Sequence, residues 1–110
     1  MDAPVAQMRK GLLEFCVLSL LSLRPRYGYE LVQDLAKSDG LLTSEGTIYP
    51  LLSRLRRERL VETEWRESTG GPPRKYYRVT ASGHRALGAF RQEWTSLRNA
   101  VDGIVKGGTK

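Results

Sequence analysis

Residues 45–79 read EGTIYPLLSRLRRERLVETEWRESTGGPPRKYYRV, and this stretch decides the fold of the chain. In its first part the apolar residues recur at the i, i+3, i+4, i+7 spacing of one helix face. In its second part the period changes to two, as in a half-buried strand. The stretch therefore predicts a helix over 45–59 and then a β-hairpin with strands over 61–66 and 75–79. The apolar stripe of the helix consists of Ile48, Leu51, Leu52 and Leu55.

Three further helices are predicted around this stretch. Residues 12–23 are apolar almost all round, as in a buried helix, and residues 28–37 repeat apolar side chains at i, i+4. Thr80 is a suitable N-cap for a last helix over 81–105, which a frayed tail at 107–110 follows. The predicted order is three helices, two strands and a long helix.

The composition excludes several classes of protein. The chain has 110 residues and a net charge of +6, which fits one domain with a polyanionic partner. It holds no apolar run long enough for a membrane span and no secretory pattern at its start, so we expect a cytoplasmic protein without membrane contact. The single cysteine, Cys16, and the single histidine, His84, offer no metal site or catalytic cluster, and we expect neither a cofactor nor an enzyme activity.

Three helices followed by a hairpin are the layout of a winged helix-turn-helix, with the hairpin as the wing. The polar face of the helix over 45–59 carries small, hydroxylic and basic side chains, which suit the major groove of double-stranded DNA. Basic residues at the wing tip suit the DNA backbone or the minor groove. The candidate DNA-binding residues are Ser44, Gly46, Thr47, Tyr49, Pro50, Ser53, Arg54 and Arg57 on the helix, and Arg74 and Lys75 at the wing tip.

Each of these features also has a structural interpretation. The arginines of 54–59 can form a solvated helix face, and Arg74 and Lys75 can keep the hairpin from pairing with other strands. A functional alternative is a winged-helix protein–protein interaction module without sequence-specific DNA binding. Such a module would expose aliphatic or aromatic anchors, and Tyr49 is thin support for that. The joint occurrence of basic residues on consecutive elements favours DNA.

Three motifs of the chain carry a resemblance. They are Tyr27-Gly28-Tyr29-Glu30-Leu31, the stretch at 45–52 with Gly46-Thr47-Ile48-Tyr49-Pro50, and the wing at 71–83. Together they resemble the PadR family of bacterial transcriptional regulators over residues 8–105, and the single helix after the wing is similar to the short PadR subfamily. The resemblance implies a homodimeric repressor that binds DNA through the winged helix. The wing departs from the family pattern: Gly71-Pro72-Pro73-Arg74 stands where members often carry glycine-arginine-proline-arginine, which removes one basic residue from the tip.

The last helix carries an apolar seam that is longer than a small monomer needs. Its alternating spacings are those of a heptad repeat, but about two and a half heptads make a marginal coiled coil on their own. We therefore expect the first helix of a second subunit to cover it, in a two-fold dimer that reads a palindromic operator. The candidate interface residues are Leu12, Leu87, Phe90, Trp94, Leu97, Val101 and Ile104. The alternative is that Leu87, Phe90 and Leu97 close the core of a monomer.

Trp94 lies in the middle of this seam and indicates a ligand site. In a multidrug-sensing member of the resembling subfamily, a tryptophan at the matching place faces its symmetry mate, and flat hydrophobic drugs stack between the two rings. The resemblance thus implies a planar hydrophobic effector, which an apolar cleft with aromatic walls suits. The candidate ligand-binding residues are Trp94, Phe90, Leu97, Val101, Met8 and Phe15. The alternative for Trp94 is plain packing in the dimer core, and Trp65 on the hairpin is expected to pack in the wing or the core.

These predictions together give a mainly α (α+β) fold. We expect residues 1–79 to form the winged helix-turn-helix DNA-binding domain. Residues 80–110 are then the long C-terminal dimerisation helix and the frayed tail.

Overall fold

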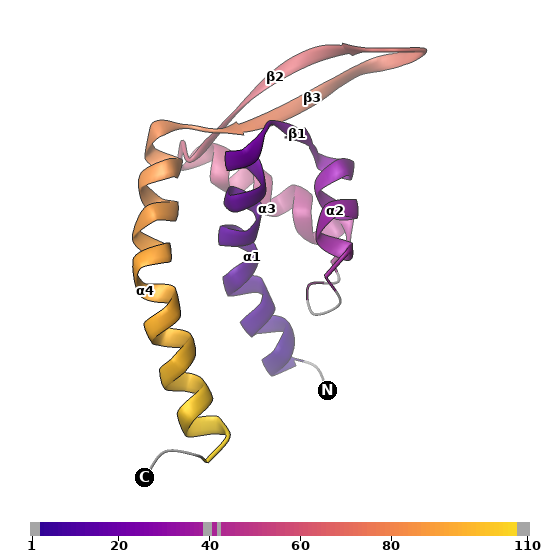
Figure 1. The fold of residues 1–110 in the computed structure, drawn as a ribbon. Coiled ribbons are helices and arrows are strands. Elements are labelled where there is room, and N and C mark those ends of the chain that lie inside the picture. The colour runs from indigo at the N-terminus through magenta and orange to yellow at the C-terminus, as the bar shows by residue number, and fades with distance from the viewer. Residues whose placement is uncertain (1–2, 39–40, 42, 108–110) are drawn as a thin grey trace.

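A computed structural model describes the backbone of residues 3–38, 41 and 43–107 and the side chains from residue 7 onward. The elements in chain order are α1 (Ala3–Leu23), β1 (Arg26–Tyr27), α2 (Gly28–Ala36), α3 (Glu45–Arg57), β2 (Val61–Ser68), β3 (Gly71–Val79) and α4 (Ala81–Val105). Figure 1 shows the helices on one side of a small sheet, the wing projecting beyond them, and α4 running beside α1. This is the predicted winged helix-turn-helix, with one short strand more than the sequence indicated.

The core forms where the apolar stripe of α3 meets α1, α2 and the sheet. Ile48, Leu52 and Leu55 are fully buried and Leu51 is half-buried, which confirms the predicted stripe. Full burial of one such side chain contributes about 1.5–3 kcal/mol, so the stripe fixes which face of α3 points outward. The other buried apolar residues are Leu13, Val17, Leu18, Leu21, Leu31, Leu35, Val61, Tyr77 and Leu87.

α3 continues through Pro50, which is its sixth residue. Proline has no N–H, so the carbonyl of Gly46 loses its helical partner, but Gly46 is exposed and water can replace the missing donor. The helix ends two residues earlier than predicted, because Arg59 adopts a left-handed φ of 62°. The amide of Leu60 then donates to the carbonyl of Leu55 at 2.9 Å, which closes the helix end.

Most bounds of the other helices agree with those predicted from the sequence. α1 begins at Ala3, before the predicted start at 12, because its first turns are too polar to show the apolar pattern. α4 has its predicted bounds, and Thr80 caps it as expected: its Oγ1 accepts a hydrogen bond from the Gly83 amide at 3.1 Å. Of the predicted frayed tail, only Gly107 lies within the described residues, in a turn.

The sheet has the strand order β1-β3-β2 and is antiparallel throughout. β1 pairs Arg26 with Tyr77 and Tyr27 with Tyr76, so it joins the base of the wing to the end of α1. A strand of two residues has no periodicity, and the sequence gives no signal for it. The guanidinium of Arg26 is buried, where it donates to the Leu20 carbonyl of α1 and lies 2.8 Å from Asp34 of α2.

The wing is longer than predicted, and this moves its basic residues away from the tip. In the stretch expected to be a loop at 68–73, Ser68 ends β2 and residues 71–73 begin β3. The turn is confined to residues 69–70, where the φ of 74° suits Gly70. Arg74 and Lys75 lie along β3, opposite Arg66 and Trp65, rather than at the tip. Pro72 and Pro73 are tolerated here because β3 beyond β1 has a neighbour on one side only, and because its pairing with β2 is irregular between Arg66 and Ser68.

The contact between Gly28 and Tyr49 explains two of the sequence motifs. The ring of Tyr49 in α3 lies directly against Gly28 at the start of α2, and a Cβ added at Gly28 would overlap it. The glycine of Tyr27-Gly28-Tyr29 therefore makes room for the tyrosine of Gly46-Thr47-Ile48-Tyr49-Pro50. This contact sets how closely α2 and α3 approach.

We expect Gly83→Ala to destabilise the fold by about 1–3 kcal/mol, the usual cost of overpacking. A Cβ at Gly83 would overlap the Leu60 carbonyl oxygen and lie 2.7 Å from Val79 Cγ1, and a backbone oxygen cannot move aside cheaply. Gly88→Ala in the same helix is the control, because nothing lies within 4 Å of its added Cβ. It should be neutral or stabilise by up to about 1 kcal/mol. Urea unfolding followed by circular dichroism measures both, and equal midpoints for the two variants would contradict the close packing at Gly83.

Candidate nucleic-acid interface

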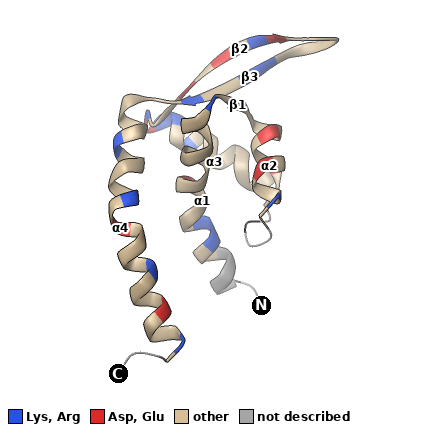
Figure 2. Cartoon of the chain, in the orientation of Figure 1, with Lys and Arg blue, Asp and Glu red and all other residues tan. Residues whose placement is uncertain are grey.

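The outward face of α3 is small, polar and open to solvent. Ser44, Gly46, Pro50, Ser53 and Arg57 are all exposed, as the sequence predicts for a reading face. Figure 2 shows basic residues on α3 and along both strands of the wing, with acidic residues among those of the wing. A helix with short side chains near its N-terminus can approach base edges closely in a major groove. The exposure of this face is therefore compatible with direct readout.

Tyr49 and Thr47 are less open than the rest of this face. Tyr49 is 40% exposed, because one side of its ring packs on Gly28, and Thr47 is half-buried. Burial and the nearby charge of Glu45 raise the pKa of Tyr49, so its hydroxyl stays protonated and can donate a hydrogen bond at neutral pH. Tyr49 thus holds α2 against α3 and still offers a polar edge to a partner.

Arg54 is held by the protein itself rather than left free. Its Nη2 donates to Glu14 of α1 at 2.7 Å, and its Nη1 donates to Glu58 of α3 at 3.1 Å. The hydrogen bond with Glu14 is the largest cause of the raised pKa of Arg54. Arg54 therefore joins α3 to α1, and its charge is largely compensated, whereas the exposed Arg57 is not paired with a carboxylate in the part of the chain that the structure describes.

The structure adds Lys10 of α1 to this surface. It lines a hollow of about 330 Å³ between α1 and α3, together with Thr47, Pro50, Arg54 and Arg57. Lys10 lies in the polar first part of α1, where the sequence shows no motif that indicates binding. Only the packing of α1 on α3 places it beside the outward face of α3. The hollow is a positive surface beside the reading face.

The two faces of the wing differ in how their charges are compensated. On one face, Arg66 pairs with Glu64 at 2.8 Å and lies over the ring of Tyr76, and Arg78 pairs with Glu62 at 2.8 Å. Arg74 belongs to the same face, and its guanidinium carbon lies 4.6 Å from the centre of the Tyr27 ring. Arg66 and Arg78 are therefore compensated within the wing, whereas Arg74 has a ring contact and no carboxylate partner among the described residues.

The other face of the wing carries Trp65 and Lys75. Lys75 Nζ lies 5.9 Å from the ring centres of both Trp65 and Tyr77. Trp65 is 68% exposed, so of the two predicted alternatives, packing in the wing or in the core, the core is wrong. Val61, at the start of β2, is buried in the core, whereas the outer part of the hairpin projects beyond the helices (Figure 1).

A second, apolar surface lies between α1 and α4. A groove of about 430 Å³ brings together four of the six candidate ligand-binding residues, namely Met8, Trp94, Leu97 and Val101. Gln7, Gly11, Leu12, Arg98 and Asp102 complete its walls. Leu97, Val101 and Ile104 are 54%, 48% and 76% exposed, so the C-terminal half of the seam is uncovered in the single chain. Leu87, in contrast, is 1% exposed inside the subunit core and is not available to a partner, contrary to its place among the interface candidates.

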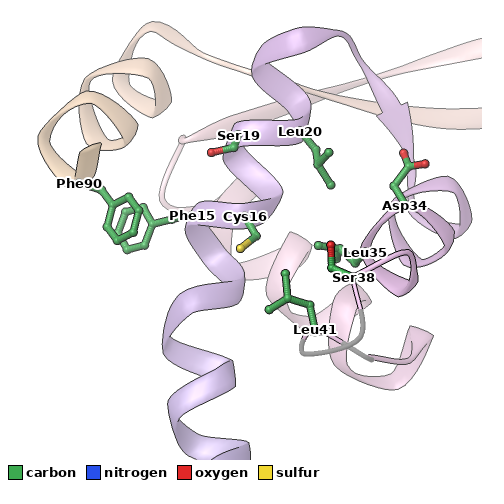
Figure 3. A pocket seen from close by; sticks show the side chains of 9 residues that line it. All are labelled: Phe15, Cys16, Ser19, Leu20, Asp34, Leu35, Ser38, Leu41 and Phe90. Carbon is green, nitrogen blue, oxygen red and sulfur yellow. The ribbon is translucent and has the colours of Figure 1, made fainter. Parts of the chain in front are cut away.

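The remaining two ligand candidates, Phe15 and Phe90, lie outside this groove. They form part of a neighbouring crevice of about 260 Å³ between α1, α2, α4 and Leu41 (Figure 3). The rings of Phe15 and Phe90 stack with 4.1 Å between their centres, and the ring of Phe90 stacks on that of Trp94 with 5.4 Å between centres. This row of three stacked rings connects the crevice to the groove. Cys16 also lines the crevice, and its partial burial raises the pKa of its thiol, which keeps it protonated and unreactive at neutral pH.

The described residues hold no cluster of three histidine, cysteine, aspartate or glutamate side chains that could ligate a metal ion. Within the same residues, no helix is long and apolar enough to cross a membrane.

Known proteins share both this sequence pattern and this fold. A family model described as the transcriptional regulator PadR-like family matches residues 17–89. A PadR-like transcriptional regulator from Bacillus cereus is 42% identical with a TM-score of 0.81, over 90% of this chain and 96% of that one. A PadR-like transcription factor from Bacteroides fragilis is 45% identical with a TM-score of 0.75, over 90% and 95% of the two chains. A PadR family regulator from Eggerthella lenta is 38% identical with a TM-score of 0.80, over 94% and 90%.

We expect Arg57→Ala to weaken binding to duplex DNA and to reduce the slope of log affinity against log salt by about one, as for the loss of one phosphate contact. Arg54→Ala should leave that slope nearly unchanged and lower the melting temperature instead, because Arg54 bonds to Glu14 and Glu58. Fluorescence anisotropy with labelled DNA at several salt concentrations measures the slopes.

Lys106→Ala is the control for the change in charge, because Lys106 is exposed at the far end of α4 from the wing (Figure 1). It should bind DNA as the parent does. If Arg57→Ala also keeps the affinity and salt slope of the parent, the assignment of the reading face to α3 is wrong.

Proposed function

Because the chain belongs to the PadR-like family of transcriptional regulators, which bind DNA, we propose that it is a homodimeric repressor that reads a palindromic operator. The observation that carries this proposal is the outward face of α3, which is polar and mostly exposed, while Ile48, Leu52 and Leu55 on the opposite face are fully buried. In the proposed complex the N-terminal half of α3 enters the major groove and the wing lies along the adjacent backbone. Backbone contacts supply most of the affinity, which therefore falls with salt.

The exposed seam of α4 supports the dimer. Leu97, Val101 and Ile104 follow one another along one side of the helix, and Met8 of α1 is 63% exposed beside them. A continuous apolar strip of this kind is costly in water and is typical of a subunit interface. Two-fold association places the α3 helices of two subunits on one DNA duplex. The dimer then recognises two half-sites, which gives it a specificity for DNA sequence that a single helix lacks.

The groove beside Trp94 supports a role for a ligand. Its walls are mostly apolar and contain one tryptophan, which suits a planar hydrophobic molecule. In the dimer this groove adjoins the seam, so its occupant lies close to the subunit interface. Such a ligand relieves repression only if it binds more tightly to the dimer geometry that cannot span both half-sites.

We expect Leu97→Glu to give monomers and to weaken binding to DNA from upstream of the chain's own gene by more than about tenfold, because a charge would be buried in the seam. Asn99→Glu is the matched control, since Asn99 is exposed and lies about 200° around the helix from Leu97. Multi-angle light scattering gives the mass and anisotropy gives the affinity. A parent chain that is monomeric, or an unchanged mass for Leu97→Glu, would contradict the dimer.

We expect planar aromatic dyes to quench Trp94 fluorescence and to release the DNA. Trp65→Phe leaves Trp94 as the one tryptophan of the chain and makes the signal specific. Trp94→Phe, which leaves only Trp65, should show no quenching by the same dyes. The ligand proposal fails if no member of a broad dye panel quenches Trp94, or if quenching leaves the affinity for DNA unchanged.

A further inference from the structure

We propose that the buried ion pair between Arg26 and Asp34 positions the wing relative to α3. Neither side chain contacts DNA in the proposed complex; both are positioning residues that act through β1 and β3. The inference rests on the proposed DNA-binding function and deepens it, because it assigns the residues that fix the angle between the two parts of the interface.

The first step is the burial of the pair. The side chains of Arg26 and Asp34 are 9% and 16% exposed, and Arg26 Nε lies 2.8 Å from Asp34 Oδ2. Charges withdrawn from water in this way are costly unless they are paired. Two apolar residues of similar size commonly stabilise a fold as well as a buried ion pair does, so stability alone does not account for this pair. What a guanidinium adds is direction, because its donors leave a rigid plane at fixed angles.

The second step is the number of elements that Arg26 connects. Its Nη1 donates to the Leu20 carbonyl, which lies in the last turn of α1 and has no N–H partner within that helix. α1 has no basic residue of its own in this turn, so the Arg26 charge also suits the negative end of the helix. The backbone of Arg26 pairs with Tyr77 of β3, while its Nε lies against Asp34 of α2. One residue therefore joins α1, α2 and the wing.

The third step is the way in which the wing is attached. Figure 1 shows β1 at the base of the wing, between the end of α1 and the start of α2. Among the described strands, the projecting part of β3 pairs with β2 alone, and only its base also pairs with β1. β1 has two residues, and so short a pairing is weak without support from side chains. Tyr27 supplies support through its ring, which meets that of Tyr76 edge-on at 5.4 Å, and the buried Arg26–Asp34 pair supplies the rest.

The fourth step connects the base of the wing to the affinity for DNA. α2, which carries Asp34, packs against α3, so the ion pair sets the wing relative to the outward face of α3. In the proposed complex the wing and this face meet one duplex together. Two contact surfaces bind more tightly when their relative position is fixed beforehand, because less freedom of motion is lost on binding. A wing that pivots at its base therefore weakens the affinity without changing which bases α3 reads.

Asp34→Asn tests the inference with a side chain of the same shape. We expect it to weaken binding to DNA from upstream of the gene by about tenfold, measured by anisotropy well below the melting temperature. A mere loss of stability leaves the affinity unchanged there, because nearly all molecules are still folded. The change in charge acts in the opposite direction, since the substitution removes a negative charge from a chain of net charge +6.

Lys37→Gln is the matched control. Lys37 Nζ lies 3.4 Å from Asp34 Oδ1, on the exposed side of the same carboxylate, so this variant removes a partner of Asp34 and leaves Arg26 in place. It should bind DNA nearly as the parent does.

A double variant separates direction from stability. Arg26→Met combined with Asp34→Leu keeps the net charge at +6 and replaces the ion pair by an apolar contact, for which the crevice beside Asp34 leaves room. Its melting temperature should exceed that of Arg26→Met alone, because no unpaired buried charge remains. Its affinity for DNA should stay about tenfold below that of the parent, because apolar contacts are non-directional.

Hydrogen exchange of the free protein gives a readout that does not depend on DNA. In Asp34→Asn the amides of the β1–β3 pairing should exchange about tenfold faster or more, whereas those of the β2–β3 ladder keep the rates of the parent. Exchange followed by nuclear magnetic resonance resolves the two sets of amides.

The outcomes that overturn the inference are distinct from failure of the proposed function. If folded Asp34→Asn binds DNA as the parent does, or exchanges its β1–β3 amides at the rates of the parent, the pair does not position the wing. The same follows if the double variant regains the affinity of the parent together with its stability. If the parent itself does not bind the duplex, the proposed function fails, and the exchange rates alone decide whether the pair holds the wing.

Discussion

The burial of one stripe of α3 is the constraint on which the rest of the structure depends. Ile48, Leu52 and Leu55 are completely withdrawn from water, and their neighbours in the core come from α1, α2 and the sheet. A helix of 13 residues with one face fixed in this way has no freedom to rotate. The polar face, with the small side chains near its N-terminus, is therefore presented to the outside in a single orientation.

Two features keep the reading helix close to its neighbours. Gly28 lets α2 approach the Tyr49 ring, and Gly83 lets the start of α4 approach the Leu60 carbonyl just after α3. Both glycines act through the absence of a side chain rather than through an unusual backbone angle. The sequence motifs that contain Gly28, Tyr49 and Gly83 therefore mark contacts between elements of the fold.

Much of this structure could be predicted from the sequence, because periodicity and capping are local signals. The apolar stripe of α3, the bounds of α4 and its Thr80 cap were visible in this way. Features that depend on tertiary packing could not be predicted in this way. β1 is too short to show a periodic pattern, and Lys10 lies beside α3 only because α1 packs on α3. For Trp65 the sequence left packing in the wing or in the core open, because alternation along a strand does not tell where the helices that cover it end, and its exposure excludes the core.

Helix α1 is shared by the two binding surfaces. Met8, Gly11 and Leu12 of α1 line the apolar groove. Two residues after Leu12, Glu14 forms an ion pair with Arg54 of α3. A rigid helix transmits a sideways displacement along its whole length, so a molecule that pushes on this wall also pulls on α3. The Glu14–Arg54 ion pair thus couples the position of the groove wall to the position of α3, and this coupling requires no unfolding of either helix.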